Sequence, residues 1–288
     1  MKSNFYFNYN GEIHAADELT VSIHNRSFRY GDGLFETMRW QNGDIQYLSY
    51  HVARLHKGMA LLKMEGAKLL DTFFIKQQAS LLIKRNKLEG PVRIRLSVFR
   101  DGGGLYSPET NKAAFLLEVS SLKSSLGSRY PAGLIIDVYK EHTKSINRFS
   151  AIKSNNALLF VMAGIYRKQQ GLDEVILLNE NGLLCESSSA NIFIWYRNSL
   201  YTPALSEGCV DGVMRRVIME VAKINNIEVI EAQINPEILN EAEEMFLTNA
   251  VHGMQWVLGY KKKRFFNRLS KDLYDKLIQW QAEKEAEA

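Results

Sequence analysis

Lys153 is the residue whose type and position most directly suggest chemistry. It lies in the run Ala151-Ile152-Lys153-Ser154, directly before a strongly apolar stretch with helical spacing. Burial lowers the pKa of an ammonium group, and the neutral amine can attack an aldehyde to form a Schiff base. A lysine at the start of a helix is more often solvated, so the pattern alone leaves both interpretations open.

A second set of candidate residues lies further along the chain, in three segments at fixed spacing from one another. The set comprises the segments Glu186–Phe193, Leu200–Pro203 and Val210–Arg215. Asp211-Gly212 indicates a turn at which a helix begins, and the free backbone N–H groups of a helix amino terminus bind anions. For Glu186, the alternative interpretation is a surface glutamate that opens a polar turn.

The 288 residues allow one large domain or two modest ones, and the elements that must position these residues fall into two groups. In the first group, Ile45–Leu48 is short and apolar, His51–Met64 and about Leu69–Lys84 have helical spacing, and Pro91–Phe99 and Ala113–Val119 indicate strands. A serine-rich stretch over 121–131 is typical of a linker. We therefore expect a small α/β domain at 1–120 and a larger one at 132–288.

Strands and helices alternate in the second group. Strands are predicted at Leu134–Tyr139, Glu174–Leu178, Asn191–Trp195, Leu200–Thr202, Glu228–Ile230 and Glu244–Leu247. Helices are predicted from about Ser154 to Gln169 and from Gly212 to about Ile224. The fold class is α/β.

In this order and spacing, the second set resembles the signature of the class IV pyridoxal-phosphate aminotransferases. The shared elements are a glutamate, a small residue two later, an asparagine five later, an aliphatic and an aromatic residue, a spaced threonine and Gly-aliphatic-x-Arg. The resemblance covers about residues 20 to 260. It implies the two-domain D-amino-acid aminotransferase-like fold, pyridoxal 5′-phosphate bound at the domain interface, and a homodimer.

The resemblance also implies roles for residues of the second domain. Lys153, 33 residues before Glu186, would form the Schiff base with the cofactor. Glu186 would keep the cofactor's ring nitrogen protonated, which the ring needs in order to withdraw electrons from the substrate. The amides of Val213 and Met214 would bind the phosphate.

The resemblance implies that the first domain supplies an arginine that binds the cofactor phosphate. The family segment His-x-x-Arg-Leu is matched by His51–Leu55, which makes Arg54 the candidate, with a structural ion pair as the alternative. Met214 and Ala250 stand where familiar transaminases have threonine, so Thr248 or Asn249 would replace the missing hydroxyl groups. Both departures look like aminodeoxychorismate lyases, which share the fold and cofactor.

The segment Asn25–Thr37 also matches the family, in which it lines the substrate side of the cofactor. Its candidate pocket residues, for which core packing is the alternative, are Tyr30, Phe35 and Thr37. The glycine-rich loop Arg100–Pro108 could close over the ligand, and Arg95 or Arg100 could pair with a substrate carboxylate. The Arg-Pro pair usual in branched-chain enzymes is absent, which argues against that specificity.

We therefore expect transamination of an amino acid with a 2-oxo acid through a lysine Schiff base. The alternative is aminodeoxychorismate lyase activity, an elimination that gives 4-aminobenzoate and pyruvate. A third reading is a relative of the fold that binds the cofactor or a metabolite without turnover.

Composition supports a globular cytoplasmic protein. Hydrophobic residues make up 46% and charged residues 24%, which excludes a disordered or fibrous chain. No apolar run is long enough for a signal or membrane segment, and the net charge of +4 is scattered except at Lys261–Arg264, so we expect no membrane or nucleic-acid partner. Cys185 and Cys209 are expected to be reduced structural thiols, and no metal site is predicted.

Overall fold

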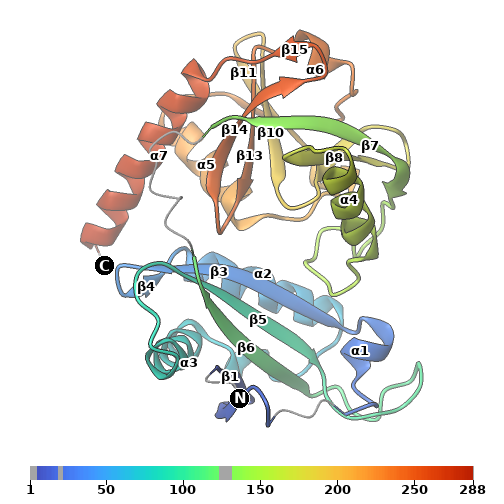
Figure 1. Ribbon diagram of the computed structural model, residues 1–288, viewed down its shortest axis with the longest axis vertical. Helices are drawn as coiled ribbons and strands as arrows, with labels where there is room; N and C mark the ends of the chain where they lie inside the picture. The colour runs from blue at the N-terminus through green and yellow to red at the C-terminus, as the bar shows by residue number, and fades with distance from the viewer. Residues whose placement is uncertain (1–4, 19–21, 123–131, 288) are drawn as a thin grey trace. The chain divides into compact units, whose positions relative to one another are not determined.

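The computed structural model describes residues 5–18, 22–122 and 132–287, and the chain divides into two compact units (Figure 1). Unit 1 comprises Met1–Ser125 together with Ile152–Asn156, and unit 2 comprises Leu126–Ala151 and Ala157–Ala288. The segment Ile152–Asn156, which falls within the predicted domain at 132–288, belongs to unit 1, whose other part, 1–125, includes the predicted domain at 1–120. Most of the predicted linker at 121–131 lies outside the described residues.

Unit 1 is built on a six-stranded sheet in which every pairing is antiparallel. In spatial order its strands are β2 (Glu12–Ala15), β1 (Tyr6–Tyr9), β6 (Ala113–Ser121), β5 (Val92–Arg100), β3 (Gly33–Gln41) and β4 (Asp44–Ile45). The short helix α1 (Arg26–Tyr30) precedes β3. The predicted strands at Pro91–Phe99 and Ala113–Val119 are confirmed as β5 and β6.

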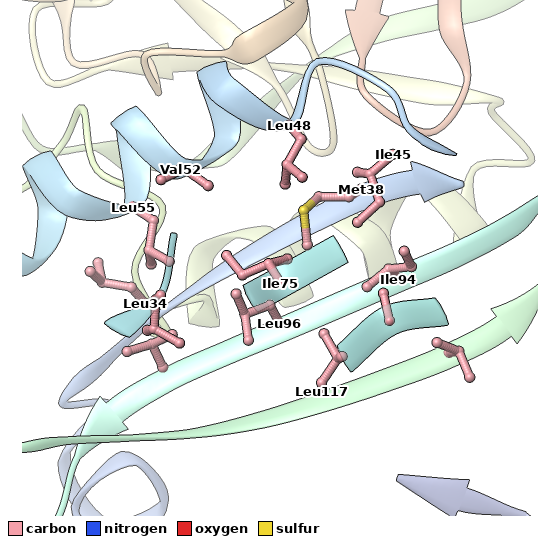
Figure 2. Close-up of a cluster of buried hydrophobic side chains, with 14 of the residues drawn as sticks. Leu34, Met38, Ile45, Leu48, Val52, Leu55, Ile75, Ile94, Leu96 and Leu117 are labelled. Atoms are coloured by element: carbon pink, nitrogen blue, oxygen red, sulfur yellow. The ribbon is translucent and has the colours of Figure 1, made fainter. Parts of the chain in front are cut away.

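Two helices cover one face of this sheet, α2 (Leu48–Leu61) and α3 (Thr72–Arg85), and a 3-10 turn at Ala67–Leu69 lies between them. They bury apolar side chains against alternate residues of β3, β5 and β6, as Figure 2 shows for Val52, Leu55 and Ile75. The Asp71 carboxylate accepts a hydrogen bond from the Phe74 amide at 2.7 Å and so caps α3. Both predicted helices are present, with α2 starting three residues earlier than expected.

Strand β3 has no counterpart among the predicted elements. Its even positions Leu34, Glu36 and Met38 are buried, whereas Phe35 and Thr37 on the other face are half-buried. The pattern has period two, but a charged glutamate occupies a buried position. The apolar alternation that marks a strand is therefore interrupted in the sequence.

Unit 2 contains a nine-stranded mixed sheet. Its main path runs β12 (Val229–Ala232), β11 (Ser199–Pro203), β10 (Asn191–Tyr196), β13 (Glu244–Asn249), β14 (Gly253–Tyr260), β7 (Leu134–Lys144), β8 (Glu174–Asn179) and β9 (Leu184–Ser187), with β15 (Lys263–Arg264) paired to β14. The pairs β11–β12, β14–β7 and β7–β8 are parallel. All six strands predicted for this part of the chain are present.

The helices of unit 2 are α4 (Leu158–Gln169), α5 (Val213–Ile224), α6 (Ile238–Glu241) and α7 (Arg268–Glu287), with a 3-10 turn at Leu205–Glu207. Helix α4 packs on β7 and β8, and α5 packs on β12, β13 and α7. The predicted start of α4 at Ser154 is wrong, since the helix begins at Leu158, and α7 was not predicted. No helix among the described residues is long and apolar enough to span a bilayer.

Both cysteines are buried and unpaired. Burial, followed by the charge of Glu186, raises the pKa of the Cys209 thiol to about 12, and the pKa of Cys185 is raised by the same causes. Such thiols stay protonated at neutral pH and react poorly. This agrees with the predicted structural role.

Candidate active site

The segment that carries Lys153 lies along the edge of β3. The chain passes from unit 2 to unit 1 between Ala151 and Ile152 and leaves again after Asn156. The Phe35 amide donates to the Lys153 carbonyl and the Asn155 amide donates to the Gly33 carbonyl, both at 2.9 Å. Lys153 is thus in extended backbone that pairs with a strand, rather than at the start of a helix as predicted.

The Lys153 side chain lies beside Phe35 and is half-buried. Its Nζ is 4.5 Å from the centroid of the Phe35 ring, and the Arg95 guanidinium carbon is 4.0 Å from the same centroid. Thr37 is the cross-strand partner of Arg95 in the β3–β5 pairing. Four residues predicted for catalysis and substrate binding therefore come together in unit 1.

Arg54, the predicted phosphate arginine, is buried on α2 and paired with Glu36 of β3. Its Nε donates to Glu36 Oε1 at 2.8 Å, and its Nη2 donates to Oε2 at 2.5 Å. His51 Nδ1 lies 2.6 Å from the same Oε2. The carboxylate fixes the orientation of the guanidinium through two parallel bonds, which is the geometry of a bidentate pair.

The titration of this buried cluster follows from its contacts. Burial alone raises the pKa of Glu36, but the charge of Arg54 and hydrogen bonds from Arg54 and His51 outweigh it and lower the value to about 2. Burial lowers the pKa of His51, and the charges of Arg54 and Lys153 act in the same direction. The cluster is therefore a carboxylate, a guanidinium and an imidazole that stays neutral at physiological pH. His51 Nε2 is buried and has no hydrogen-bond partner within the described parts of the chain.

Glu186 is buried on β9 in unit 2 and is held at both carboxylate oxygens. The Lys144 ammonium forms an ion pair with Oε1, and the Val210 amide donates to Oε2 at 3.1 Å. Lys144, at the end of β7, did not stand out in the sequence. The contact joins residues 42 positions apart, so no local pattern signals it.

The amino terminus of α5 forms a tight backbone cradle. Gly212 is the N-cap and provides no side-chain hydrogen bond, and a Cβ placed on it would lie 1.8 Å from the Asn191 Oδ1. Val213 and Met214, the predicted phosphate amides, are the first two residues of the helix. Only glycine permits this approach of Asn191, whose Nδ2 donates to the Val210 carbonyl at 2.9 Å.

Thr248 adds a hydroxyl group to this region. It is the cross-strand partner of Asn191, and its buried Oγ1 finds no hydrogen-bond acceptor or donor among the residues that the structure describes. A buried hydroxyl without a partner is costly unless something binds it. The hydroxyl and the free amides of the helix start fit a small anion such as a phosphate ester.

Asn249 and the serines after Glu186 shape the adjoining turns. The Asn249 Oδ1 accepts from the amides of Val251 and His252 at 3.1 and 2.7 Å, and its Nδ2 reaches the Ser189 carbonyl at 3.4 Å. The Ser189 hydroxyl donates to the buried carboxylate of Glu174 at 2.5 Å. Asn249 and Glu174 therefore hold the loop that follows Glu186, and Glu174 was not among the predicted residues.

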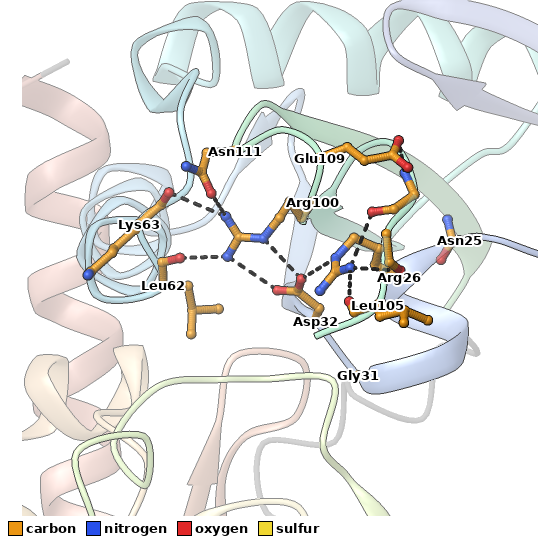
Figure 3. A network of polar contacts seen from close by, with 12 residues as sticks. Asn25, Arg26, Gly31, Asp32, Leu62, Lys63, Arg100, Leu105, Glu109 and Asn111 are labelled. Atoms are coloured by element: carbon orange, nitrogen blue, oxygen red, sulfur yellow. Dashed lines mark hydrogen bonds and ion pairs between the residues drawn. The ribbon is translucent and has the colours of Figure 1, made fainter. Parts of the chain in front are cut away.

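Arg100 lies in a polar network of unit 1 that also contains Arg26 and Asp32 (Figure 3). The Asp32 carboxylate accepts from the Nε of both Arg26 and Arg100, at 2.8 and 3.0 Å. Arg100 also donates to the Leu62 carbonyl at 2.6 Å and to the Asn111 Oδ1 at 2.5 Å.

The same network holds the glycine-rich loop. Arg26 Nη1 donates to the Leu105 carbonyl at 2.6 Å, and the Tyr30 ring packs against the Arg26 guanidinium and the Tyr106 ring. These contacts anchor the loop to helix α1. The substrate-carboxylate role of Arg100 stays a prediction, while its guanidinium here binds protein acceptors.

We predict that Glu36→Gln destabilises unit 1 and removes part of its acid sensitivity. The pKa of Glu36 is about 2 in the folded chain against 4.5 for the ordinary residue, so its contribution is present above pH 4.5 and is lost as the pH falls toward 2. The contribution amounts to about 3 kcal/mol of unfolding free energy. Denaturant unfolding at neutral pH and across the acid range measures it.

Glu12→Gln is the matched control, because the Glu12 side chain is 83% exposed. This variant should unfold like the wild type at every pH. An acid dependence of Glu36→Gln identical to that of the wild type would contradict the assignment of the buried ion pair.

Comparisons with known proteins agree with the geometry. The family model described as amino-transferase class IV matches residues 33–260. A D-alanine aminotransferase of Bacillus licheniformis is 26% identical over 260 residues, covering 84% of this chain and 83% of that protein. An aminodeoxychorismate lyase of Bacillus subtilis is 28% identical over 248 residues, covering 84% and 82%.

The fold is also that of a solved relative. The branched-chain amino acid aminotransferase of Thermobaculum terrenum in its pyridoxal-phosphate form superposes with a TM-score of 0.82 at 20% identity, over 97% of this chain and 94% of that one. The predicted fold class and cofactor are confirmed. The chain belongs to the class IV aminotransferase family, whose members use pyridoxal 5′-phosphate.

Proposed function

We propose that the protein transfers an amino group from an amino acid to a 2-oxo acid, with Lys153 as the residue that binds the cofactor and moves the proton. The observation that carries this proposal is the arrangement around Phe35, because the Lys153 ammonium and the Arg95 guanidinium both lie over its ring. An amine and a fixed cation on one half-buried face suit a substrate that offers both a reacting amino group and a carboxylate.

The cofactor would be held by residues that each suit one of its chemical groups. Bound pyridoxal phosphate supplies an aldehyde and a cationic heterocycle that withdraws electrons from the substrate's Cα. We assign the aldehyde to Lys153 and the ring nitrogen to Glu186. We assign the phosphate to Arg54, Thr248 and the α5 amides of Val213 and Met214, with Asn249 positioning the neighbouring turn.

Lys153 is suited to move a proton at the substrate Cα once its amine is released. The Lys153 amine and the Arg95 guanidinium lie at the same aromatic ring, so a group that can move a proton and a cation are next to each other. Burial is the largest influence on Arg95 and lowers its pKa; the charge of Glu118 acts in the opposite direction, and the charge of Arg93 lowers the pKa again. In this proposal Arg95 binds the substrate carboxylate, while Phe35, Thr37 and Tyr30 line the substrate side.

Aminodeoxychorismate lyase activity is the second candidate, and two residues favour it. Met214 stands at the second position of α5 and Ala250 follows Asn249, in places where familiar transaminases carry threonine. The Bacillus subtilis relative of that name supports the same reading. Both reactions would use Lys153 to remove the same Cα proton.

We also propose that the protein is a homodimer, as the family resemblance implies. Unit 1 exposes large apolar side chains that a second copy could cover, namely Ile23, Phe28, Leu105 and Tyr106. The cytoplasmic location stays a prediction from the sequence.

We predict that one of L-glutamate, L-leucine and D-alanine converts the cofactor of the loaded protein to pyridoxamine phosphate, with one equivalent of 2-oxo acid. Chromatography of acid-quenched single-turnover mixtures measures both products. Lys153→Ala should form neither, because it lacks the amine that moves the proton, whereas the exposed control Lys140→Ala should react like the wild type.

Two results would contradict transamination. Silence with all three donors together with 4-aminobenzoate formation from aminodeoxychorismate would assign the lyase reaction. Equal turnover by Lys153→Ala and the wild type would show that another residue moves the proton.

We predict that Gly212→Ala weakens binding of pyridoxal phosphate at least tenfold, or about 1.4 kcal/mol. The new methyl group would overlap the Asn191 Oδ1, so either Asn191 or the start of α5 must move. Titration of the cofactor-free protein, followed by absorbance, gives the dissociation constant.

Gly164→Ala is the matched control, because Gly164 lies within α4 and a Cβ there meets nothing within 4 Å. It should bind the cofactor as the wild type does. Wild-type affinity in Gly212→Ala would remove the α5 amides from the phosphate site.

A further inference from the structure

Lys144 is a buried lysine that the proposed reaction does not use. It is 9% exposed at the end of β7, where the pairing of β7 with β8 is irregular between Tyr139 and Lys144. Its ammonium contacts the Glu186 Oε1, the Ser150 carbonyl at 3.3 Å and the face of the Phe160 ring at 5.4 Å. The ammonium is thus directed toward one carboxylate and away from water.

Burying an ammonium and a carboxylate is costly unless the two pair and their remaining polar atoms are hydrogen-bonded. Lys144 and Glu186 meet this condition, because the Ser150 carbonyl accepts from the lysine and the Val210 amide donates to the glutamate. Glu186 is 4% exposed. The orientation of Glu186 is therefore fixed from two sides, by the Lys144 ammonium and by the Val210 amide.

We propose that Lys144 is a positioning residue that keeps Glu186 charged and oriented, so that a proton shared between Glu186 and the cofactor's ring nitrogen resides on the nitrogen. This inference rests on the role proposed above for Glu186. An opposite charge beside a carboxylate favours its ionised form, and a carboxylate that is buried without such a partner is more readily protonated.

The position of that proton determines how strongly the cofactor can withdraw electrons. A proton on Glu186 leaves the ring nitrogen neutral, and a neutral ring is a weaker electron sink. Lys144 thus acts on the reaction through Glu186 without touching the substrate. The two lysines, nine positions apart, would have opposite requirements, since Lys144 must stay charged and Lys153 must become neutral.

The test is the nitrogen-15 chemical shift of ring-labelled pyridoxal phosphate bound to the full-length protein, which reports the ring protonation state directly. We expect Lys144→Met to move the signal toward the neutral position by at least half of the change produced by Glu186→Gln. Lys144→Arg should restore the wild-type signal because it returns a cation. Lys140→Met, an exposed change on the same strand, should leave the signal unchanged.

A structural role alone would not move this signal. If Lys144→Met does not fold, Lys144→Gln serves in its place, because it keeps a hydrogen-bond donor and removes only the charge. A wild-type signal in Lys144→Met or Lys144→Gln, with a shifted signal in Glu186→Gln, would overturn the role of Lys144 and leave that of Glu186. An unshifted signal in Glu186→Gln would overturn the assignment of Glu186 and this inference with it.

Discussion

The pairing of residues 152–156 with the edge of β3 is the constraint on which the rest of the proposed site depends. Ile152 is buried in the core of unit 1, and the hydrogen bonds of the Lys153 carbonyl and the Asn155 amide to β3 fix the backbone on both sides of Ser154. The strand alternation then places Phe35 and Thr37 on one face, with Arg95 opposite Thr37 on β5. The flexible side chain of Lys153 starts from a defined position because the backbone of this residue is hydrogen-bonded to a strand of the sheet.

Both units contain buried charged groups, and in each unit a buried partner of opposite charge compensates them. In unit 1 the Glu36 carboxylate neutralises Arg54 and accepts from His51, and in unit 2 Lys144 neutralises Glu186. In the proposed function, the guanidinium of the first pair and the carboxylate of the second are the groups that contact the cofactor. Under that proposal, the arginine would bind the phosphate and the glutamate the heterocyclic nitrogen, with both groups already removed from water and held in place.

The sequence was informative where the signal is local. The α5 start at Gly212 and six strands of unit 2 follow from short motifs and from period-two or period-3.6 patterns, whereas β9, β14 and β15 were not predicted. Lys153, Phe35, Thr37 and Arg95 were also named, although nothing in the pattern showed that they would meet. The family match then confirmed the fold class and the cofactor.

What could not be predicted depends on contacts between distant residues. Glu36 interrupts the apolar pattern of β3. It is buried there because it pairs with Arg54, which lies 18 positions away on a helix. Lys144 has no local signal, and the acceptors of Arg100, among them Asp32 and Leu62, come from other parts of unit 1 and could not be read from the sequence around it. At buried charged residues, hydrophobic patterns fail to predict the structure, because the burial of such a residue is explained only by its partners elsewhere in the chain.

The most direct test of the central claim is to reduce the cofactor-loaded protein with borohydride and to map the modified lysine by peptide mass spectrometry. The account predicts that the phosphopyridoxyl group is found on Lys153 in a one-to-one ratio with the chain. A label on Lys144, or on any other lysine in place of Lys153, would contradict it.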